Sequence, residues 1–141
     1  MGSGFLRVSF SSKRIVNKLK ELGFTNRKTY DIIPHPLLKG SRDFWRGVVD
    51  GDGWVYRTKV KCIGLSGHIN TITELLTFLN LNGVDTKTNP YKDKKKEYLW
   101  TCDLHSIKAE RTANLLYKDS TIYLERKYQS YLEIVNESEL N

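Results

Sequence analysis

Residues 44–53 read Phe44-Trp45-Arg46-Gly47-Val48-Val49-Asp50-Gly51-Asp52-Gly53, an apolar, helix-like run that ends in two aspartates alternating with glycines. Carboxylates at a helix C-terminus are disfavoured by up to about 1 kcal/mol, because that end carries partial negative charge. Each glycine inside a helix costs about as much relative to alanine. The sequence therefore predicts that something other than helix stability favours this run. The two candidates are a divalent cation held by the carboxylates and a second backbone that approaches the glycines.

The chain of 141 residues is long enough for one ordinary domain with its own core. Its 23 Lys and Arg residues exceed the 16 Asp and Glu residues, which gives a formal net charge of +7 and a pI near 9.4. This excess favours a polyanionic partner, with nucleic acid as the leading candidate. The sequence contains no long apolar run and no signal-type start, so we expect a soluble, intracellular protein without a membrane partner.

Upstream of the quoted run, alternating residues predict a strand over 5–10, and an apolar stripe predicts a helix that begins after Ser11 or Ser12 and closes at Gly23. Two prolines within residues 33–38 predict a connector. We therefore divide the chain into a tag or linker over 1–4, an accessory arm or repeat remnant over 5–43, a core domain over 44–135 and a frayed tail over 136–141.

Downstream, strand-like and helix-like segments alternate, as judged by apolar residues at period two or period 3.6. The expected elements are a helix from about 42 to 50, a strand or hairpin over 54–65, a helix over 69–81, a hairpin with strands 84–91 and 97–104, and helices over 106–117 and 121 to about 135. This order predicts an α+β domain with an antiparallel sheet, helices on one face and an exposed basic face.

Cationic side chains are concentrated along the predicted sheet. Arg57, Lys59 and Lys61 occupy alternate positions of the strand expected over 54–65, so we expect them on the same face. A solvated sheet face explains this pattern equally well. The turn of the later hairpin carries several lysines, which fits either a soluble tip or a phosphate contact.

The cysteines and histidines do not indicate a zinc site. Cys62 and Cys102 lie 40 residues apart, and His35, His68 and His105 are scattered singly. Neither set has the clustered spacing that zinc ligation requires. We therefore expect buried thiols in a reducing compartment.

Residues 45–53 resemble the nine-residue motif that names the LAGLIDADG homing endonucleases. The glycine and aspartate positions at 47, 50, 52 and 53 match that motif, Val48 and Val49 are similar, Gly51 is a common variant, and Trp45 and Arg46 depart from its Leu-Ala start. Segments 116–120 and 122–128 are similar to the C-terminal signature of phage and intron members. The resemblance covers roughly residues 5–135.

The resemblance implies the LAGLIDADG fold and a site-specific double-strand DNA endonuclease that hydrolyses phosphodiesters with Mg²⁺ or Mn²⁺ at a two-fold helix interface. Small residues at such a crossing allow two helix backbones to approach closely. Asp52 is the expected metal ligand, because two like carboxylates near one axis repel each other unless a cation neutralises them. Asp50 is expected either to hold a structural contact or to join the metal site. The expected contact residues of the motif helix are Phe44, Gly47, Val48 and Gly51.

The resemblance further implies a cation that offsets phosphate charge. Lys127, in the tail signature, is the expected catalytic lysine. Lys28 is its counterpart in a weak internal echo, in which a strand, a helix and an Arg-Lys pair occur twice. We expect the sheet to lie in the major groove of double-stranded DNA. The expected DNA-binding residues are Arg57, Lys59, Lys61, Lys87, Asn89, Tyr91, Lys92, Lys94, Lys95 and Lys96.

A single motif copy leaves the source of the second helix open. A homodimer with residues 5–43 as an accessory arm is the favoured interpretation, and a degenerate double-motif enzyme is the other. The same fold can also serve as a non-cleaving DNA-binding protein or an RNA-splicing maturase. The intact run over 50–53 favours the enzyme, because carboxylates facing phosphate would repel it without a metal. A basic interaction domain is the third alternative. Members of this class belong to the cytoplasm of bacteria or phage hosts, or to organelles.

Overall fold

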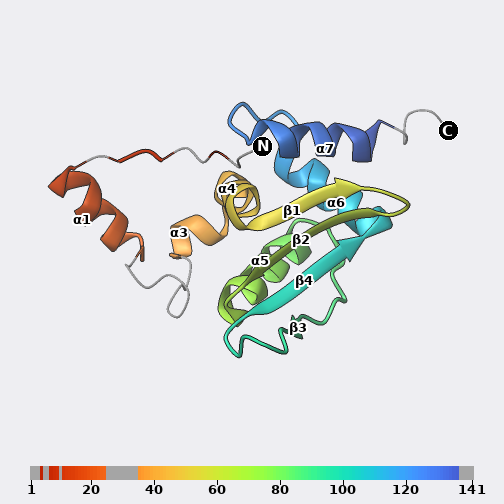
Figure 1. Ribbon diagram of the computed structural model, residues 1–141, viewed down its shortest axis with the longest axis horizontal. Helices are drawn as coiled ribbons and strands as arrows, with labels where there is room; N and C mark the ends of the chain where they lie inside the picture. Colours follow the sequence, from red (N-terminus) through yellow and green to blue (C-terminus); the bar gives the residue numbers. More distant parts are fainter. Residues whose placement is uncertain (1–3, 5–6, 10, 25–34, 137–141) are drawn as a thin grey trace.

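The computed structural model describes residues 4, 7–9, 11–24 and 35–136, and every structural statement below refers to these residues. They form six helices and a four-stranded antiparallel sheet, which confirms the α+β class (Figure 1). The helices are α1 (Lys13–Glu21), α3 (Pro36–Lys39), α4 (Arg42–Asp52), α5 (Ile69–Leu81), α6 (Ser106–Tyr117) and α7 (Glu125–Val135). The strands are β1 (Gly53–Arg57), β2 (Lys61–Gly67), β3 (Tyr91–Lys92) and β4 (Trp100–His105).

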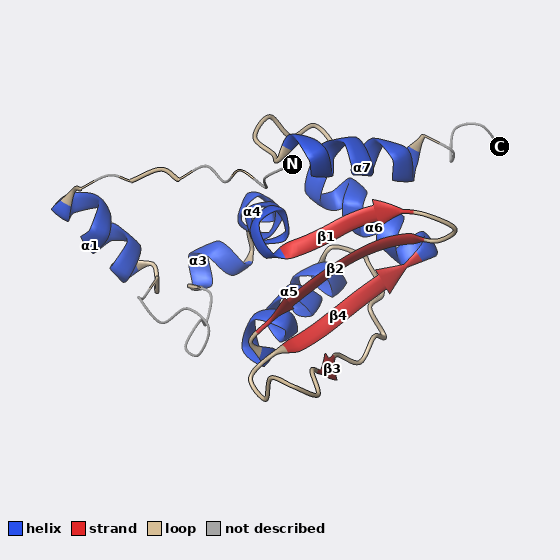
Figure 2. Ribbon diagram, in the orientation of Figure 1, coloured by secondary structure: helices blue, strands red, loops and turns tan. Residues whose placement is uncertain are grey.

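The sheet has the order β1-β2-β4-β3 with antiparallel neighbours (Figure 2). Val55 lies opposite Ile63, which in turn lies opposite Leu104, so the three side chains share one face. That face carries the hydrophobic core, and α4, α5, α6 and α7 cover it. No described helix contributes to the opposite face, which is called the open face below. The buried side chains that the helices add include Trp45, Val49, Ile72, Leu79, Ala109, Ala113, Leu116, Tyr131 and Ile134.

Helix α4 passes directly into strand β1 without a connecting loop. Ser41 begins the helix by accepting a hydrogen bond from the Phe44 N–H at 3.2 Å. Gly53 ends it and also opens β1. A Cβ at Gly53 would lie 2.5 Å from the carbonyl oxygen of Gly64, so only glycine fits at this junction. The C-terminus of α4 is therefore held against the sheet.

Two helix predictions are confirmed at both ends. Helices α5 and α6 span the residues that the apolar periodicity indicates. His68 is the N-cap of α5, and its Nδ1 accepts a hydrogen bond from the Asn70 N–H at 3.2 Å. Gly83 follows the end of the helix with a φ of +82°. Helix α1 begins after Ser12, as its N-cap predicts. Helices α4 and α7 match less closely, since α4 continues to Asp52 and α7 begins only at Glu125.

Of the two alternatives expected over 54–65, a strand or a hairpin, the structure has the hairpin. Strands β1 and β2 pair with each other, and residues 58–60 connect them. This connection lacks the Gly, Pro or Asn that normally indicates a turn. The hairpin expected from residue 84 to residue 104 is shorter than predicted, because β3 holds only Tyr91 and Lys92.

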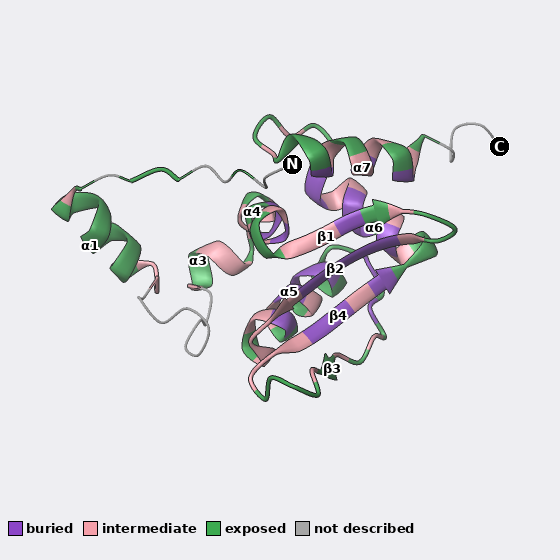
Figure 3. Cartoon of the chain, in the orientation of Figure 1, coloured by how far each residue is buried: buried purple, intermediate pink, exposed green. Residues whose placement is uncertain are grey.

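The N-terminal predictions fare less well. The connector over 33–38 contains the start of α3, with Pro36 in its first turn, where the missing N–H costs no hydrogen bond. Residues 7–9 do not form the strand expected over 5–10, whose other positions lie outside the described residues. Helix α1 lies apart from the sheet in Figure 1, and Figure 3 shows no buried side chain on it.

Candidate functional site at the end of helix α4

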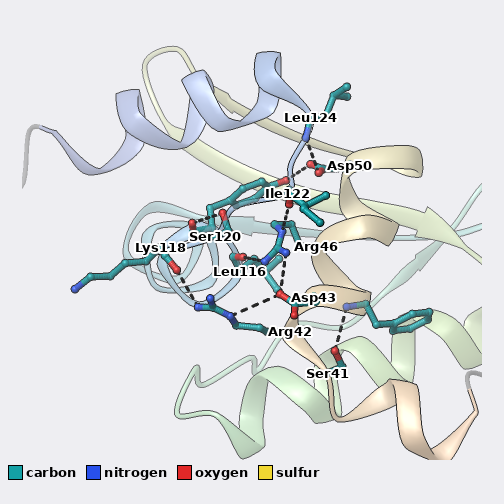
Figure 4. A network of polar contacts seen from close by, with 12 residues as sticks. Ser41, Arg42, Asp43, Arg46, Asp50, Leu116, Lys118, Ser120, Ile122 and Leu124 are labelled. Carbon is teal, nitrogen blue, oxygen red and sulfur yellow. Dashed lines mark hydrogen bonds and ion pairs between the residues drawn. The ribbon is translucent and has the colours of Figure 1, made fainter. Parts of the chain in front are cut away.

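The Asp50 carboxylate is held by two hydrogen bonds from other parts of the chain. Its Oδ1 accepts a bond from the Tyr117 hydroxyl at 2.6 Å, and its Oδ2 accepts one from the Leu124 N–H at 2.8 Å (Figure 4). Leu124 is the N-cap of α7, so the carboxylate lies where the helix dipole favours negative charge. Burial and the bond to Asp50 raise the pKa of Tyr117. This geometry favours the structural role for Asp50 over the role of metal ligand.

Asp52 differs from Asp50 in every one of these respects. It is the last residue of α4 and is exposed. No described residue donates a hydrogen bond to its carboxylate or forms an ion pair with it. The free carboxylate at this end of the helix is therefore Asp52.

Lys127 caps the C-terminus of α4 from inside the protein. Its side chain is 3% exposed, and its Nζ donates to the carbonyl oxygens of Val49, of Asp50 at 2.7 Å and of Gly53 at 2.6 Å. Carbonyls in the last turn of a helix have no partner within the helix, so the ammonium satisfies groups that would otherwise be unpaired. Three donated bonds use all three N–H groups of the charged form.

The environment of Lys127 acts on its charge in both directions. Burial lowers the pKa of Lys127, and Arg126 contributes in the same sense, whereas Asp50 and Asp52 raise it. The ammonium points at the helix end, and its donors are already occupied by carbonyls. The structure therefore places Lys127 as a residue that positions the turn carrying Asp52. Lys28, the other expected catalytic lysine, lies outside the described residues.

A buried arginine fixes α4 against the connection between α6 and α7, as Figure 4 shows. Arg46 is 5% exposed, its Nε donates to the Ile122 carbonyl at 2.7 Å, and its guanidinium also donates to the Leu116 carbonyl at 3.0 Å. It pairs with Asp43 at 2.8 Å. Trp45 is fully buried and donates to the Lys39 carbonyl at 2.8 Å. The two motif positions that depart from the Leu-Ala start therefore both anchor the helix, which the sequence did not indicate.

The two glycines within α4 lie on a side of the helix where no described residue packs against them. A Cβ added at Gly47 or Gly51 would meet no atom within 4 Å. Phe44 and Val48, the other two expected contact residues of the motif helix, are partly buried against the core. The glycines are therefore not required by the packing of the described residues.

The expectation that Arg57 and Lys61 lie on an exposed cationic face of the sheet is wrong. They lie opposite each other in the register and share the helix-covered face with Val55. Arg57 donates to the Glu133 carbonyl of α7 at 3.0 Å, and Lys61 pairs with Glu110 of α6 at 2.7 Å. Strand alternation groups both residues with Val55 and Ile63, but the helices cover that face, which leaves Arg57 and Lys61 at the rim of the core.

The remaining expected DNA-binding residues lie at the margins of the sheet. Lys59 is exposed in the connection between β1 and β2. The segment that contains β3 carries a turn in which Asp93 accepts hydrogen bonds from two backbone N–H groups, at 2.7 and 3.1 Å. This turn displays its lysines to solvent. The expected DNA-binding residues of this segment, all of them exposed, are Lys87, Asn89, Tyr91, Lys92, Lys94, Lys95 and Lys96.

Sequence reasoning missed an aspartate at the centre of the open face. Asp103 of β4 accepts a hydrogen bond from the Trp54 indole N–H at 2.9 Å and one from the Tyr91 hydroxyl at 2.7 Å. The bond to Asp103 is the main cause that raises the pKa of Tyr91 to about 12. Alternation within residues 100–105 places Asp103 on the face of the sheet that points away from the core. Only the tertiary structure brings Trp54, Tyr91 and Asp103 together.

The other candidate ligands give no metal cluster. Cys62 and Cys102 are free and buried, as expected. Among the described residues, no group of three or more His, Cys, Asp or Glu side chains could hold a metal ion. None of the described helices combines the length and the apolar character needed to span a bilayer. Comparisons of this chain with protein-family models, with curated proteins and with solved structures found no match.

Proposed function

We propose that two copies of this chain form a site-specific, LAGLIDADG-type endonuclease that cleaves double-stranded DNA. The observation that carries the proposal is the exposed side of α4, where Gly47 and Gly51 have no neighbours and the free carboxylate of Asp52 follows directly. The +7 charge of the chain suits a nucleic-acid partner. The expected order of elements after α4, two strands, a helix, two strands and two helices, is also present.

The glycines argue for a second helix at this surface. A glycine within a helix costs up to about 1 kcal/mol relative to alanine, and the described residues make no contact that offsets this cost at Gly47 or Gly51. Close approach of a second backbone does use the missing side chains. The connection beside α4 adds two exposed apolar side chains, Ile122 at 79% and Leu124 at 39% exposed. A two-fold arrangement would cover this surface and bring two copies of Asp52 near the axis.

The donor set of one chain fits a magnesium ion only in part. Asp52 is the single free carboxylate at the site, whereas Mg²⁺ is commonly held by one or two carboxylates together with water and substrate phosphates. Asp52 from each copy would complete such a set. When bound there, Mg²⁺ or Mn²⁺ would stabilise charge on phosphate oxygens and lower the pKa of a bound water.

The chain itself contributes a rigid support for Asp52. Lys127 holds the last carbonyls of α4, and Tyr117 and Leu124 hold Asp50 two residues before the ligand. A ligand on a fixed backbone loses less freedom on binding, so this scaffold is suited to positioning a carboxylate. Lys59 and the lysines around β3 would contact DNA phosphates.

A cleavage assay with matched variants tests the proposal. The full chain is incubated with a plasmid library and Mg²⁺ or Mn²⁺, beside Asp52→Asn and the control Asp85→Asn, which changes an exposed aspartate in the loop after α5. We expect the wild type and the control to linearise a subset of plasmids and Asp52→Asn to linearise none. Sedimentation should show a dimer. If the wild type shifts DNA in a gel but linearises no plasmid with either metal, the nuclease proposal is wrong.

The non-cleaving alternative, a DNA-binding protein or RNA-splicing maturase of the same fold, is favoured by a different observation. The aromatic cluster on the open face around Asp103 has no role in the α4 site. It would bind nucleic acid without any contribution from Asp52.

A further inference from the structure

The indole of Trp54 lies across the central strand of the sheet. In the register, Trp54 lies opposite Gly64, and Gly64 lies opposite Asp103. A Cβ at Gly64 would come within 2.5 Å of the indole, so the glycine is what allows the ring to occupy this position. The ring spans β2 and its N–H reaches Asp103 on the far side at 2.9 Å. Trp54 is therefore anchored through its only polar atom.

The polar groups at the centre of the open face are occupied by one another. Asp103 accepts hydrogen bonds from Trp54, from Tyr91 and, at 3.9 Å, from the Cys62 thiol. The hydroxyls of Ser66 and Thr101 share a hydrogen bond of 2.6 Å. Reading the edges of base pairs in a duplex requires free donors and acceptors. The centre of this face therefore offers few groups for edge recognition.

Aromatic surface is what the open face does offer. Tyr56 is 43% exposed, Tyr91 is 55% exposed, and Trp54 is partly buried on the same face. Aromatic side chains on an open antiparallel sheet bind bases by stacking, and a stacked base must be unpaired to present its face. Rings that are already held in place lose little freedom on binding.

We propose that the open face of the sheet binds unpaired bases of a single-stranded nucleic acid, with Trp54 and its neighbours Tyr56 and Tyr91 as the stacking surface. The proposal goes beyond the nuclease function, because it requires neither Asp52 nor a metal nor a second copy of the chain. Asp103 and Gly64 act as positioning residues that set the orientation of the indole.

The charges around the face suit a nucleic-acid backbone. Lys59 lies in the connection at one end of the β1–β2 hairpin, and β3 forms the far edge of the sheet and is followed by a turn with the exposed residues Lys94, Lys95 and Lys96. Residues 85–97, which comprise β3 and the loops that flank it, contain five lysines against three acidic residues. One of the three, Asp93, is engaged with backbone N–H groups. A strand lying across the aromatic rings would thus meet cations at both sides.

A comparison between a normal strand and an abasic strand separates base stacking from phosphate binding. The full chain, in EDTA, is titrated by fluorescence anisotropy with a labelled 12-nucleotide thymidine strand and with an abasic strand of equal length and charge. We expect the wild type to bind the thymidine strand about tenfold or more tightly than the abasic one. Trp54→Leu should lose that preference. The control Lys59→Ala should weaken both complexes equally and reduce their salt dependence.

Two results would overturn the proposal. One is equal affinity of the wild type for the two strands, which would mean that only phosphates are bound. The other is a tighter complex with a 12-base-pair duplex that Trp54→Leu leaves unchanged. Circular dichroism checks the fold of each variant, and Tyr56→Leu, which removes an exposed ring, repeats the test if Trp54→Leu does not fold. Because the assay contains no metal, its outcome is independent of whether the chain cleaves DNA.

Discussion

The two sides of helix α4 differ in how far contacts among the described residues account for the amino acids found there. On the inner side, Trp45 is fully buried, Arg46 donates to two distant carbonyls, and Asp50 accepts two hydrogen bonds. On the outer side, Gly47 and Gly51 meet nothing and the Asp52 carboxylate has no described partner. The inner side is the part of the motif that a monomer needs. No described residue uses the two glycines or the carboxylate of the outer side, and the proposed dimer would account for them.

The glycines of this region illustrate the same difference. Gly53 and Gly64 are required by the fold, because a Cβ at either position would lie 2.5 Å from a neighbouring atom. Gly47 and Gly51 have open space around them. A glycine is therefore informative about function mainly where the structure gives no reason for it.

The largest expected effect compares the two aspartates. Asp50→Ala should lower the free energy of unfolding by about 2–4 kcal/mol, because it leaves the buried Tyr117 hydroxyl and the Leu124 N–H without their acceptor. Asp52→Ala should change the free energy of unfolding by less than about 0.5 kcal/mol, as is usual for an exposed residue without partners. Urea denaturation of both variants measures the difference. Similar losses in the two variants would break the contrast between the sides of α4.

The next effect compares two glycines and has opposite signs. Gly64→Ala should destabilise the chain by about 1–3 kcal/mol, because the added methyl group displaces the Trp54 indole. Gly47→Ala should stabilise the monomer by roughly 0.5–1 kcal/mol through helix propensity, and should weaken self-association. Thermal unfolding at low protein concentration and sedimentation at high concentration give the two readouts. A Gly47→Ala variant that is less stable as a monomer would show that this surface is already covered.

The smallest effect concerns pH and extends the contrast to the open face, where Tyr91 has an occupied hydroxyl. The pKa of Tyr91 is raised from 10.0 to about 12, so the folded chain holds this proton more tightly than the unfolded chain. Its contribution to stability is therefore complete below about pH 10 and is lost as the pH rises towards about 12. A titration of the Tyr91 ring by NMR measures the pKa directly. Asp103→Asn should return it towards 10.0, and an unchanged pKa would remove Asp103 as the cause.

The elements that the sequence predicted best are those whose signals are local. Helices α5 and α6 follow from apolar residues at helical spacing. The sequence left a strand or a hairpin open over 54–65, because the β1–β2 connection, Thr58-Lys59-Val60, contains no residue that favours a turn. Alternation also could not decide which face of these strands the helices cover, so Arg57 and Lys61, which meet α7 and α6, were expected in solvent.

The sequence alone singled out the aspartate and glycine run as unfavourable for a helix, because helix propensity and the helix dipole are local properties. Only the tertiary structure decided what each residue does. It brings Tyr117, 67 residues away, to Asp50, and Lys127 to the carbonyls that end α4. These contacts depend on how α6 and α7 pack against α4, which no local pattern encodes. The same packing separates Asp50, which is bound within the fold, from Asp52, which remains available to a ligand.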